Sequence, residues 1–282
     1  MSRPPTFVPP PCAHAAVLRT ARGDFAVIDA RPSGTPRGTV VLLPGFTGSK
    51  EDFIALHEPL AEAGYRSVAV DGRGQYESDG PRDDQAPYAQ GELARDVLAQ
   101  TEALAAGPVH LVGHSLGGQI SRAAVLLDAS PFASLTLMSS GPAQISPSQQ
   151  QRAKLLLDAL AVMDMAQVWE AIQALDAPEE TDTDAELRGR WLRHSPAQLT
   201  ATGRQLLTEP DRVDELAAVP LPKHVVSGER DDTWPVPLFD EMARRLGAER
   251  SVIAGAEHSP NTDQPARTAA ALLAFWDGLQ ER

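Results

Sequence analysis

Apolar runs alternate with helical patterns through the first half of the chain and again near its end. Thr39–Leu43 is a continuous run of β-branched residues and leucine, which is typical of a parallel strand buried on both faces. Alternation at this spacing implies right-handed crossovers and therefore an α/β fold with a doubly wound, mostly parallel sheet. The pattern predicts further strands over Ser67–Val70, Val109–Val112, Ser134–Ser139, Lys223–Ser227 and Arg250–Ile253, and helices over Asp52–Ala63, Gln90–Ala105, Gly118–Leu127, Pro237–Leu246 and Ala266–Leu279.

Two regions depart from this alternation. Ala16–Thr20 and Phe25–Ala30 flank a short turn with glycine near its tip, which predicts a hairpin at the edge of the sheet. From Pro142 to about Pro220 no segment has a convincing strand pattern. Helical periodicity covers Gln151–Leu160, Met165–Leu175 and Ala185–Arg193 instead.

Strand patterns on both sides of this helical region indicate one sheet with an insertion between its sixth and seventh strands. We therefore predict an N-terminal lead over residues 1–15, a core formed by residues 16–141 and 221–282, and a helical cap over residues 142–220. The acidic run Glu179–Asp184 lacks the glycine and the terminal glutamate of a calcium-binding loop, so we interpret it as a solvated loop between cap helices.

Composition narrows the classes of function. The net charge of -13 would repel a phosphate backbone, which argues against nucleic acid as a partner. The single cysteine, Cys12, excludes a disulfide framework and a thiolate metal cluster. No stretch approaches the roughly 20 apolar residues that span a bilayer, and the N-terminus lacks the apolar core of a signal peptide. These features predict a cytoplasmic protein with no membrane association.

The stretch Gly113-His114-Ser115-Leu116-Gly117 places a serine between two glycines, where an apolar strand gives way to a helix. A serine hydroxyl is a weak nucleophile, so it needs a base on one side and hydrogen-bond donors for an oxyanion on the other. A tight strand-to-helix turn presents it in this way, and the crowding of that turn favours glycine two residues before and two after the serine. The motif predicts Ser115 as a nucleophile.

A serine nucleophile needs a base, and histidine titrates in the suitable range. The chain has seven histidines, and active residues of α/β folds lie in loops at the carboxyl ends of strands. Only His258 directly follows the last strand and precedes the last helix. The others lie in the lead, in the predicted helices, strands or cap, or beside Ser115, where we expect only packing or a local hydrogen bond: His14, His57, His110, His194, His224 and His114.

A carboxylate must orient this histidine and should follow an earlier strand. No acid follows the strand before the cap, whereas the strand after it leads into Ser227-Gly228-Glu229-Arg230-Asp231-Asp232. We favour Asp231, with Asp232 as the competitor. The oxyanion needs two backbone donors, one after the nucleophile and one from the loop after the first central strand. Leu116 and Phe46 fit these places, because Pro44 has no N–H to donate.

With these residues in this order, the chain resembles the α/β-hydrolase fold superfamily, and in particular its capped serine-type members such as microbial esterases and lipase-like hydrolases. Two departures stand out. Pro44 stands where many members have a histidine, and Tyr76 stands where a glycine is common in the loop after the second central strand. The serine at the elbow separates the chain from dehalogenases and epoxide hydrolases of this fold, which use aspartate there.

The predicted reaction is a two-step acyl transfer through an acyl-enzyme, with an ester or a related carbonyl compound as the substrate and no metal or organic cofactor. Carbon–carbon bond hydrolysis, perhydrolysis and acyl transfer to another acceptor are alternatives on the same fold, and a ligand-binding protein without turnover is a further one. The predicted partner is a small, largely apolar molecule, and the cap is expected to roof its pocket. Candidate lining residues are Phe46, Met163, Met165, Trp169, Trp191 and Trp234, although such residues often only pack a helix onto its neighbour.

Overall fold

A computed structural model describes residues 2–176 and 184–280 of the chain. Its centre is a mixed, mostly parallel sheet of eight strands in the order β1-β2-β4-β3-β5-β6-β7-β8. β1 pairs antiparallel with β2, which pairs antiparallel with β4, and all later pairings are parallel. The strands are β1 (Ala13–Thr20), β2 (Gly23–Ala30), β3 (Gly38–Leu43), β4 (Tyr65–Val70), β5 (Val109–His114), β6 (Phe132–Met138), β7 (Lys223–Gly228) and β8 (Glu249–Ile253).

This arrangement confirms the predicted α/β fold with its doubly wound, mostly parallel sheet and edge hairpin. The central strands are buried along almost their whole length, as their unbroken apolar runs require, whereas the edge strand β1 alternates between half-buried and exposed residues. β1 begins at Ala13, so His14 lies in the edge strand, opposite Asp29 of β2.

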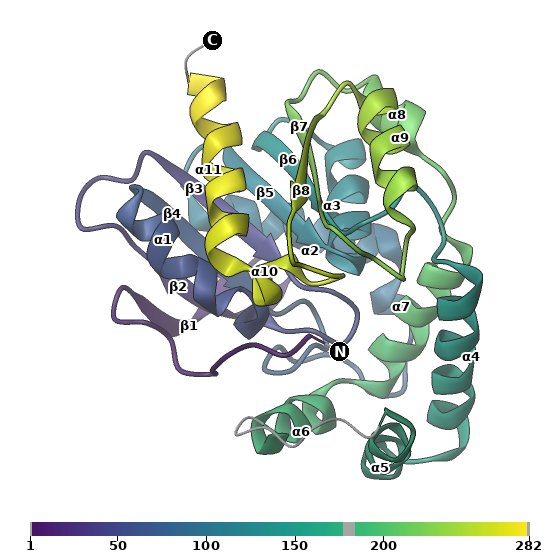
Figure 1. Cartoon of the computed structure of the whole chain (residues 1–282). Coiled ribbons are helices and arrows are strands. Elements are labelled where there is room, and N and C mark those ends of the chain that lie inside the picture. The colour runs from purple at the N-terminus through teal and green to yellow at the C-terminus, as the bar shows by residue number, and fades with distance from the viewer. Residues whose placement is uncertain (1, 177–183, 281–282) are drawn as a thin grey trace.

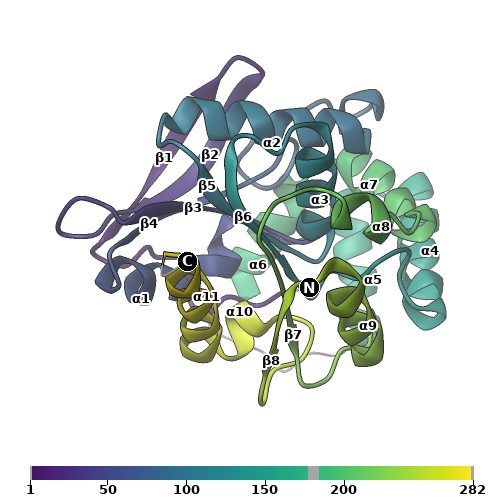
Figure 2. The same cartoon turned by 90° about the horizontal axis from the view of Figure 1, so that it is seen from above.

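Helices cover both faces of the sheet (Figures 1 and 2). On one face α2 (Gln90–Leu104), α3 (Leu116–Leu127) and α9 (Val236–Leu246) contribute to one apolar cluster. On the other face a second cluster is formed with η1 (Lys50–Leu56), α1 (His57–Glu62) and α11 (Pro265–Gln280). Two short helices, η2 (Ala86–Tyr88) and α10 (Pro260–Asp263), lie in connecting loops.

The helix predicted over Asp52–Ala63 is divided into a 3-10 segment, η1, and the α-helix α1. Pro59 explains the break. A proline lacks the N–H of an intrahelical hydrogen bond and is tolerated in the first turn of an α-helix, so α1 begins just before it, at His57.

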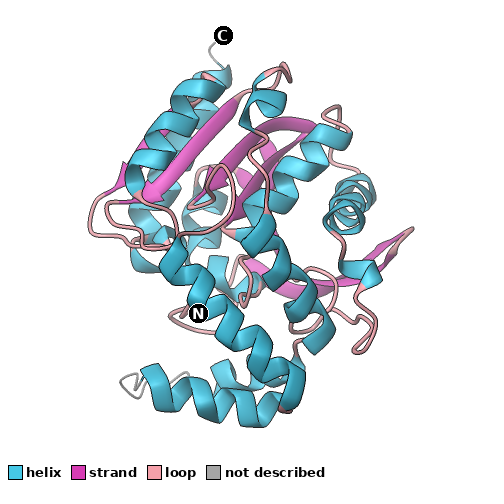
Figure 3. Cartoon of the chain, turned by 90° about the vertical axis from the view of Figure 1, so that its right-hand side faces the viewer, coloured by secondary structure: helices cyan, strands magenta, loops and turns pink. Residues whose placement is uncertain are grey.

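A helical insert lies between β6 and β7, as predicted, and extends from one end of the sheet (Figures 1 and 3). Two of its helices, α7 (Pro196–Thr208) and α8 (Val213–Ala217), were not predicted. Ser195 at the N-cap of α7 accepts a hydrogen bond from Gln198 N–H, and Pro196 occupies the first turn, so this Ser-Pro pair is the start signal that could have revealed the helix. The insert comprises α4 (Pro147–Val162), α5 (Met165–Asp176), α6 (Asp184–Arg193), α7 (Pro196–Thr208) and α8 (Val213–Ala217).

Candidate active site

Ser115 occupies a sharp turn between β5 and α3, with φ 53° and ψ -118°. A non-glycine residue in this region is strained, and strain of this kind persists only where the surroundings impose it. Glycines make the turn possible: a Cβ at Gly113 would overlap the Gly117 carbonyl, and a Cβ at Gly117 would overlap the Leu43 carbonyl. The predicted elbow is therefore a steric necessity of this strand–helix junction.

Ser115, His258 and Asp231 lie in one chain of hydrogen bonds. Ser115 Oγ is 3.0 Å from His258 Nε2, and His258 Nδ1 is 3.0 Å and 2.9 Å from the two carboxylate oxygens of Asp231. Because an ionised carboxylate only accepts, this contact places the proton of a neutral His258 on Nδ1 and leaves Nε2 as an acceptor for the serine hydroxyl. The Asp231 side chain is fully buried, while 26% of the His258 side chain is exposed.

The two neighbouring acids, Asp231 and Asp232, make different contacts in the structure. Asp231 Oδ1 accepts the backbone N–H groups of Thr233 and Trp234 at 2.8 Å and 3.2 Å, so the chain itself aims this carboxylate at His258. Asp232 instead accepts a hydrogen bond at 2.6 Å from Gln149 of α4 and is turned toward the helical insert. Of the two candidates, Asp231 is the one that contacts the imidazole.

His114 contacts the same histidine from the other side. Its Nε2 donates to the backbone carbonyl of His258 at 2.8 Å, and the two ring centroids are 5.2 Å apart. Burial lowers the pKa of His114 to about 4, with a smaller contribution from His258, so the ring is neutral at physiological pH. The hydrogen bond of His114 is therefore not local in sequence, and it holds the backbone of the loop that carries His258.

The loop after β3 borders the serine. A Cβ added at Gly45 would come within 3.3 Å of Ser115 Cβ, so the Gly45–Phe46 peptide lies beside the elbow. Leu116 is the first residue of α3, where a helical N–H has no intrahelical acceptor. The two predicted oxyanion donors, Phe46 and Leu116, therefore both flank Ser115, and their role stays a prediction.

The predicted lining residues differ in position. Trp234 is buried, and its indole Nε1 donates to the carbonyls of Ala143 and Gln144, where the helical insert begins. Its ring centroid is 6.1 Å from that of His258. Phe46 packs against both the core and the apolar cluster of the insert. Trp234 therefore belongs to the core cluster beside His258, whereas Phe46 bridges the core and the insert.

The remaining lining candidates lie within the insert. Met163 is exposed at the end of α4. Met165, Trp169 and Trp191 are buried in a cluster of their own, in which Trp191 Nε1 donates to the Met165 carbonyl at 2.7 Å. Their contacts are those of helices packed on each other, and contact with a substrate stays a prediction for all four.

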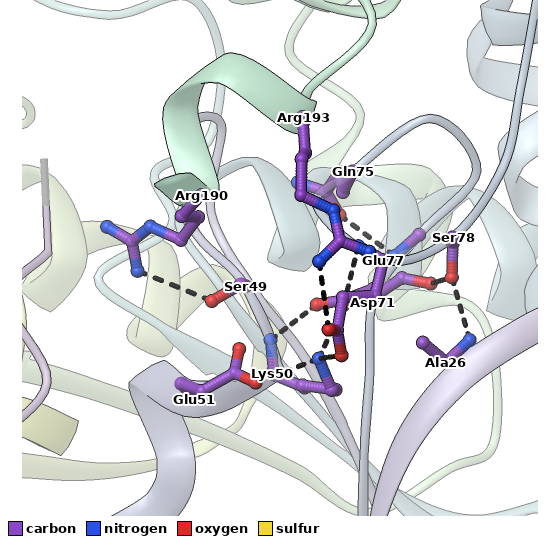
Figure 4. A network of polar contacts seen from close by, with 12 residues as sticks. Ala26, Ser49, Lys50, Glu51, Asp71, Gln75, Glu77, Ser78, Arg190 and Arg193 are labelled. Carbon is purple, nitrogen blue, oxygen red and sulfur yellow. Dashed lines mark hydrogen bonds and ion pairs between the residues drawn. The ribbon is translucent and has the colours of Figure 1, made fainter. Parts of the chain in front are cut away.

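A buried ionic network that the sequence did not reveal lies next to these loops (Figure 4). Lys50 Nζ is 2.9 Å from Asp71, 2.8 Å from Glu51 and 2.7 Å from Glu77, and only 1% of the lysine side chain is exposed. Burial opposes the charge, but the carboxylates outweigh it and hold the pKa of Lys50 above its ordinary value. Burial raises the pKa of Asp71 to about 7, against the attraction of the Lys50 ammonium.

Two buried ion pairs join the insert to the core. Arg190 of α6 pairs with Asp52 of η1 at 2.7 Å, and both side chains are completely buried. Arg122 of α3 pairs with Glu209 directly after α7 and also donates to the Pro142 carbonyl, so one arginine contacts the start of the insert and the end of its helix α7. These contacts fix the insert over the loops that carry the site.

No cluster of three or more histidine, cysteine, aspartate or glutamate side chains suited to a metal ion occurs within residues 2–176 and 184–280. The acidic run that begins at Glu179 lies outside the described residues, apart from Asp184. In the described part of the chain, none of the helices combines the length and the apolar character that crossing a bilayer requires.

Comparison with known proteins agrees with this geometry. The sequence profile described as "Alpha/beta hydrolase family" matches residues 40–271. The chain is 31% identical over 239 residues, 78% of its length and 80% of the relative's, to a 2-hydroxy-6-oxononadienedioate/2-hydroxy-6-oxononatrienedioate hydrolase of Paraburkholderia xenovorans. It is 33% identical over 170 residues, 55% of its length and 65% of the relative's, to a pimeloyl-[acyl-carrier protein] methyl ester esterase of Aeromonas hydrophila.

Among solved structures, a thermophilic esterase from Thermogutta terrifontis superimposes with a TM-score of 0.76 over 95% of this chain and 99% of that one. Because the two sequences are only 21% identical, this similarity shows a shared fold and nothing more.

Proposed function

The chain belongs to the alpha/beta hydrolase family, and within it we propose a serine hydrolase that cleaves an ester or a related carbonyl compound through an acyl-enzyme. The observation that carries this proposal is the continuous hydrogen-bonded chain from Ser115 through His258 to Asp231, with its serine on a strained turn. A nucleophile within 3.0 Å of its base, and a base within 3.0 Å of its orienting carboxylate, are the arrangement that serine acyl transfer needs.

In the proposed reaction, Ser115 Oγ attacks the carbonyl carbon while His258 Nε2 takes the hydroxyl proton. The tetrahedral intermediate collapses when His258 returns this proton to the leaving alcohol, and the acyl group remains on Ser115. Water then attacks the acyl-enzyme with His258 again as the base, and the acid is released. Asp231 keeps the imidazole in the reactive tautomer and stabilises its positive charge.

The negative charge of each tetrahedral intermediate develops on the former carbonyl oxygen. We assign its stabilisation to the N–H groups of Phe46 and Leu116, which flank the serine from the two adjoining loops. Removal of one such donor from well-studied sites lowers kcat by about 100- to 1000-fold, so this pair carries a large share of the proposed rate enhancement.

Charge and burial favour a neutral, apolar acyl group. Three buried cations near the junction of insert and core, Lys50, Arg122 and Arg190, are each paired with carboxylates of the chain itself. Their charges are therefore neutralised within the protein, and none of the three is left to pair with an anionic acyl group. The ring of Phe46 faces the insert beside Leu157 and Gly203, which supports an apolar lining on this side of the serine. The predicted cytoplasmic location stays a prediction.

A second candidate is carbon–carbon bond hydrolysis by the same triad. The relative from Paraburkholderia xenovorans favours it, because its name gives dicarboxylates as substrates. The paired cations argue for the ester, since a dianionic substrate needs positive charge in its pocket.

The test is hydrolysis of p-nitrophenyl esters of increasing acyl length, set beside an ester whose acyl chain ends in a carboxylate. We expect turnover of the neutral esters, much lower kcat/KM for the anionic one, and a loss of at least about 10⁴-fold in kcat for Ser115→Ala. Undiminished turnover by Ser115→Ala would contradict the mechanism, and a preference for the anionic ester would favour the second candidate.

A further inference from the structure

Gln75 joins the loop after β4 to the loop that borders the serine. Its side chain is 6% exposed, and its amide makes two hydrogen bonds to backbone: Oε1 accepts the N–H of Gly72 at 3.0 Å, and Nε2 donates to the carbonyl of Gly45 at 2.9 Å. One neutral side chain thus ties together two loops that are distant in sequence.

The bond to Gly45 has a geometric consequence. The Gly45 carbonyl and the Phe46 N–H belong to one planar trans peptide and point in opposite directions. A hydrogen bond that holds the carbonyl therefore also sets the direction of the N–H. Since a Cβ added at Gly45 would come within 3.3 Å of Ser115 Cβ, this peptide borders the serine, and we place its N–H beside the oxyanion of the proposed reaction.

Gln75 is itself held in place. Within its loop Gln75 N–H donates to the Gly72 carbonyl at 2.9 Å, and Ser78 Oγ donates to the Asp71 carbonyl at 2.7 Å. The Asp71 carboxylate accepts the backbone N–H and the ammonium of Lys50 (Figure 4). The buried ionic network thus anchors the loop from which Gln75 extends.

Tyr76, the residue after Gln75, is also held in a fixed conformation. Its φ of 37° lies in the left-handed region, which costs a non-glycine residue energy. The Lys50 ammonium and the Arg193 guanidinium lie 4.7 Å and 4.9 Å from the centroid of the Tyr76 ring. Cation–π contacts with two cations hold this residue, so the backbone that positions Gln75 has little freedom.

We propose that Gln75 is a positioning residue for the oxyanion site: its Nε2–H holds the Gly45–Phe46 peptide so that the Phe46 N–H faces the reacting carbonyl oxygen. The inference rests on the proposed function, because it assumes acyl transfer at Ser115. A donor that is fixed in advance stabilises charge in the transition state without reorganisation, so the loss of Gln75 should affect kcat more than substrate binding.

The experiment compares Gln75→Glu and Gln75→Met with the wild type. Gln75→Glu retains the acceptor for Gly72 N–H and removes the donor to Gly45, whereas Gln75→Met removes both without adding charge. We expect both variants to lose about 10- to 100-fold in kcat, with KM within about twofold. We also expect an equal loss of affinity for an aryl trifluoromethyl ketone, which forms an oxyanion on Ser115. The matched control is Gln205→Glu, which removes the same type of bond, Nε2 to the Tyr88 carbonyl at 2.6 Å, on α7.

Three outcomes would overturn the proposal: unchanged kcat in a folded Gln75 variant, a rise in KM without a loss of kcat, or a loss of kcat in Gln75→Met alone. If Gln75→Glu does not fold, Gln75→Met alone tests the proposal. Its fold-loss in kcat should then equal its fold-loss in affinity for the trifluoromethyl ketone, and unequal losses would overturn the proposal. Ser115→Ala, assayed in parallel, distinguishes the failures, because turnover in that variant would contradict the proposed function itself.

Discussion

The core and the helical insert differ in the interactions that determine their conformation and position. In the core Ser115, Asp231 and His258 each follow a strand of the parallel part of the sheet. Backbone sterics leave little choice of conformation at the elbow, where a Cβ at Gly113 or Gly117 would overlap a backbone carbonyl.

The insert meets the core through buried ion pairs and through apolar side chains that join the cluster of the core, among them Leu206, Val213 and Leu216. It also packs a small apolar cluster of its own. No residue of its helix α4, which is described in full, is buried, and Leu155 and Val162 are strongly exposed. The proposed chemistry thus rests on loops of the sheet, under an insert that buried ion pairs and apolar contacts attach to the core.

Two adjacent acids give the sharpest test of this division, because Asp231 faces the core and Asp232 faces the insert. Asp231→Asn should lower kcat by about 10⁴-fold, since an amide in place of the carboxylate favours the wrong imidazole tautomer. Asp232→Asn should leave kcat almost unchanged, because its carboxylate contacts Gln149 of α4 and not the imidazole. Steady-state ester hydrolysis by the two variants measures the loss of kcat in each. Equal losses would contradict the assignment of different roles to Asp231 and Asp232.

The ion pair between Arg190 and Asp52 tests how the insert is attached. Arg190→Met leaves a completely buried carboxylate without its partner, so we expect a loss of about 3 to 5 kcal/mol in the free energy of unfolding. Hydrogen exchange should quicken in α6 and α7 before it does in β5. Arg193→Met on the same helix is the control, because its pair with Glu77 is partly exposed and should be worth at most about 1 kcal/mol. Equal effects of the two substitutions would show that the buried pair has no special role.

Buried histidines should make the fold sensitive to acid. Burial lowers the pKa to about 4 for five of them, so the unfolded chain binds protons below about pH 6.5 that the folded chain does not: His57, His110, His114, His194 and His224. The free energy of unfolding should therefore fall as the pH drops from 6.5 to 4, by up to about 1.4 kcal/mol per pH unit for each histidine. The Asp71 carboxyl, whose pKa burial raises to about 7, has the opposite effect, but it is one group against five.

Urea unfolding at several pH values measures this slope. His57→Gln removes a histidine whose ring contacts Ser67 and none of Ser115, Asp231 and His258. It should reduce the dependence of the free energy of unfolding on pH by up to about 1.4 kcal/mol per pH unit, the effect of one proton. A free energy of unfolding that does not change between pH 6.5 and 4 would contradict the assignment of neutral buried histidines.

The difference between local patterns and contacts of distant segments explains what could be predicted from the sequence. The sheet, the insert and the positions of Ser115, Asp231 and His258 follow from local rules: apolar runs, chain order and the glycines of a crowded turn. Lys50, Gln75 and Arg190 act through contacts with segments distant in sequence, and no local pattern marks such partners. Helix α7 was not predicted although it has a local start signal, the pair Ser195-Pro196.

The account depends most directly on Ser115 as the nucleophile. The measurement is covalent labelling of the folded protein by a fluorophosphonate, followed by peptide mass spectrometry. We predict one adduct per chain, located on Ser115, absent from Ser115→Ala and formed far more slowly by His258→Gln. A folded wild-type protein that gains no adduct, or one labelled at another residue, would contradict the account.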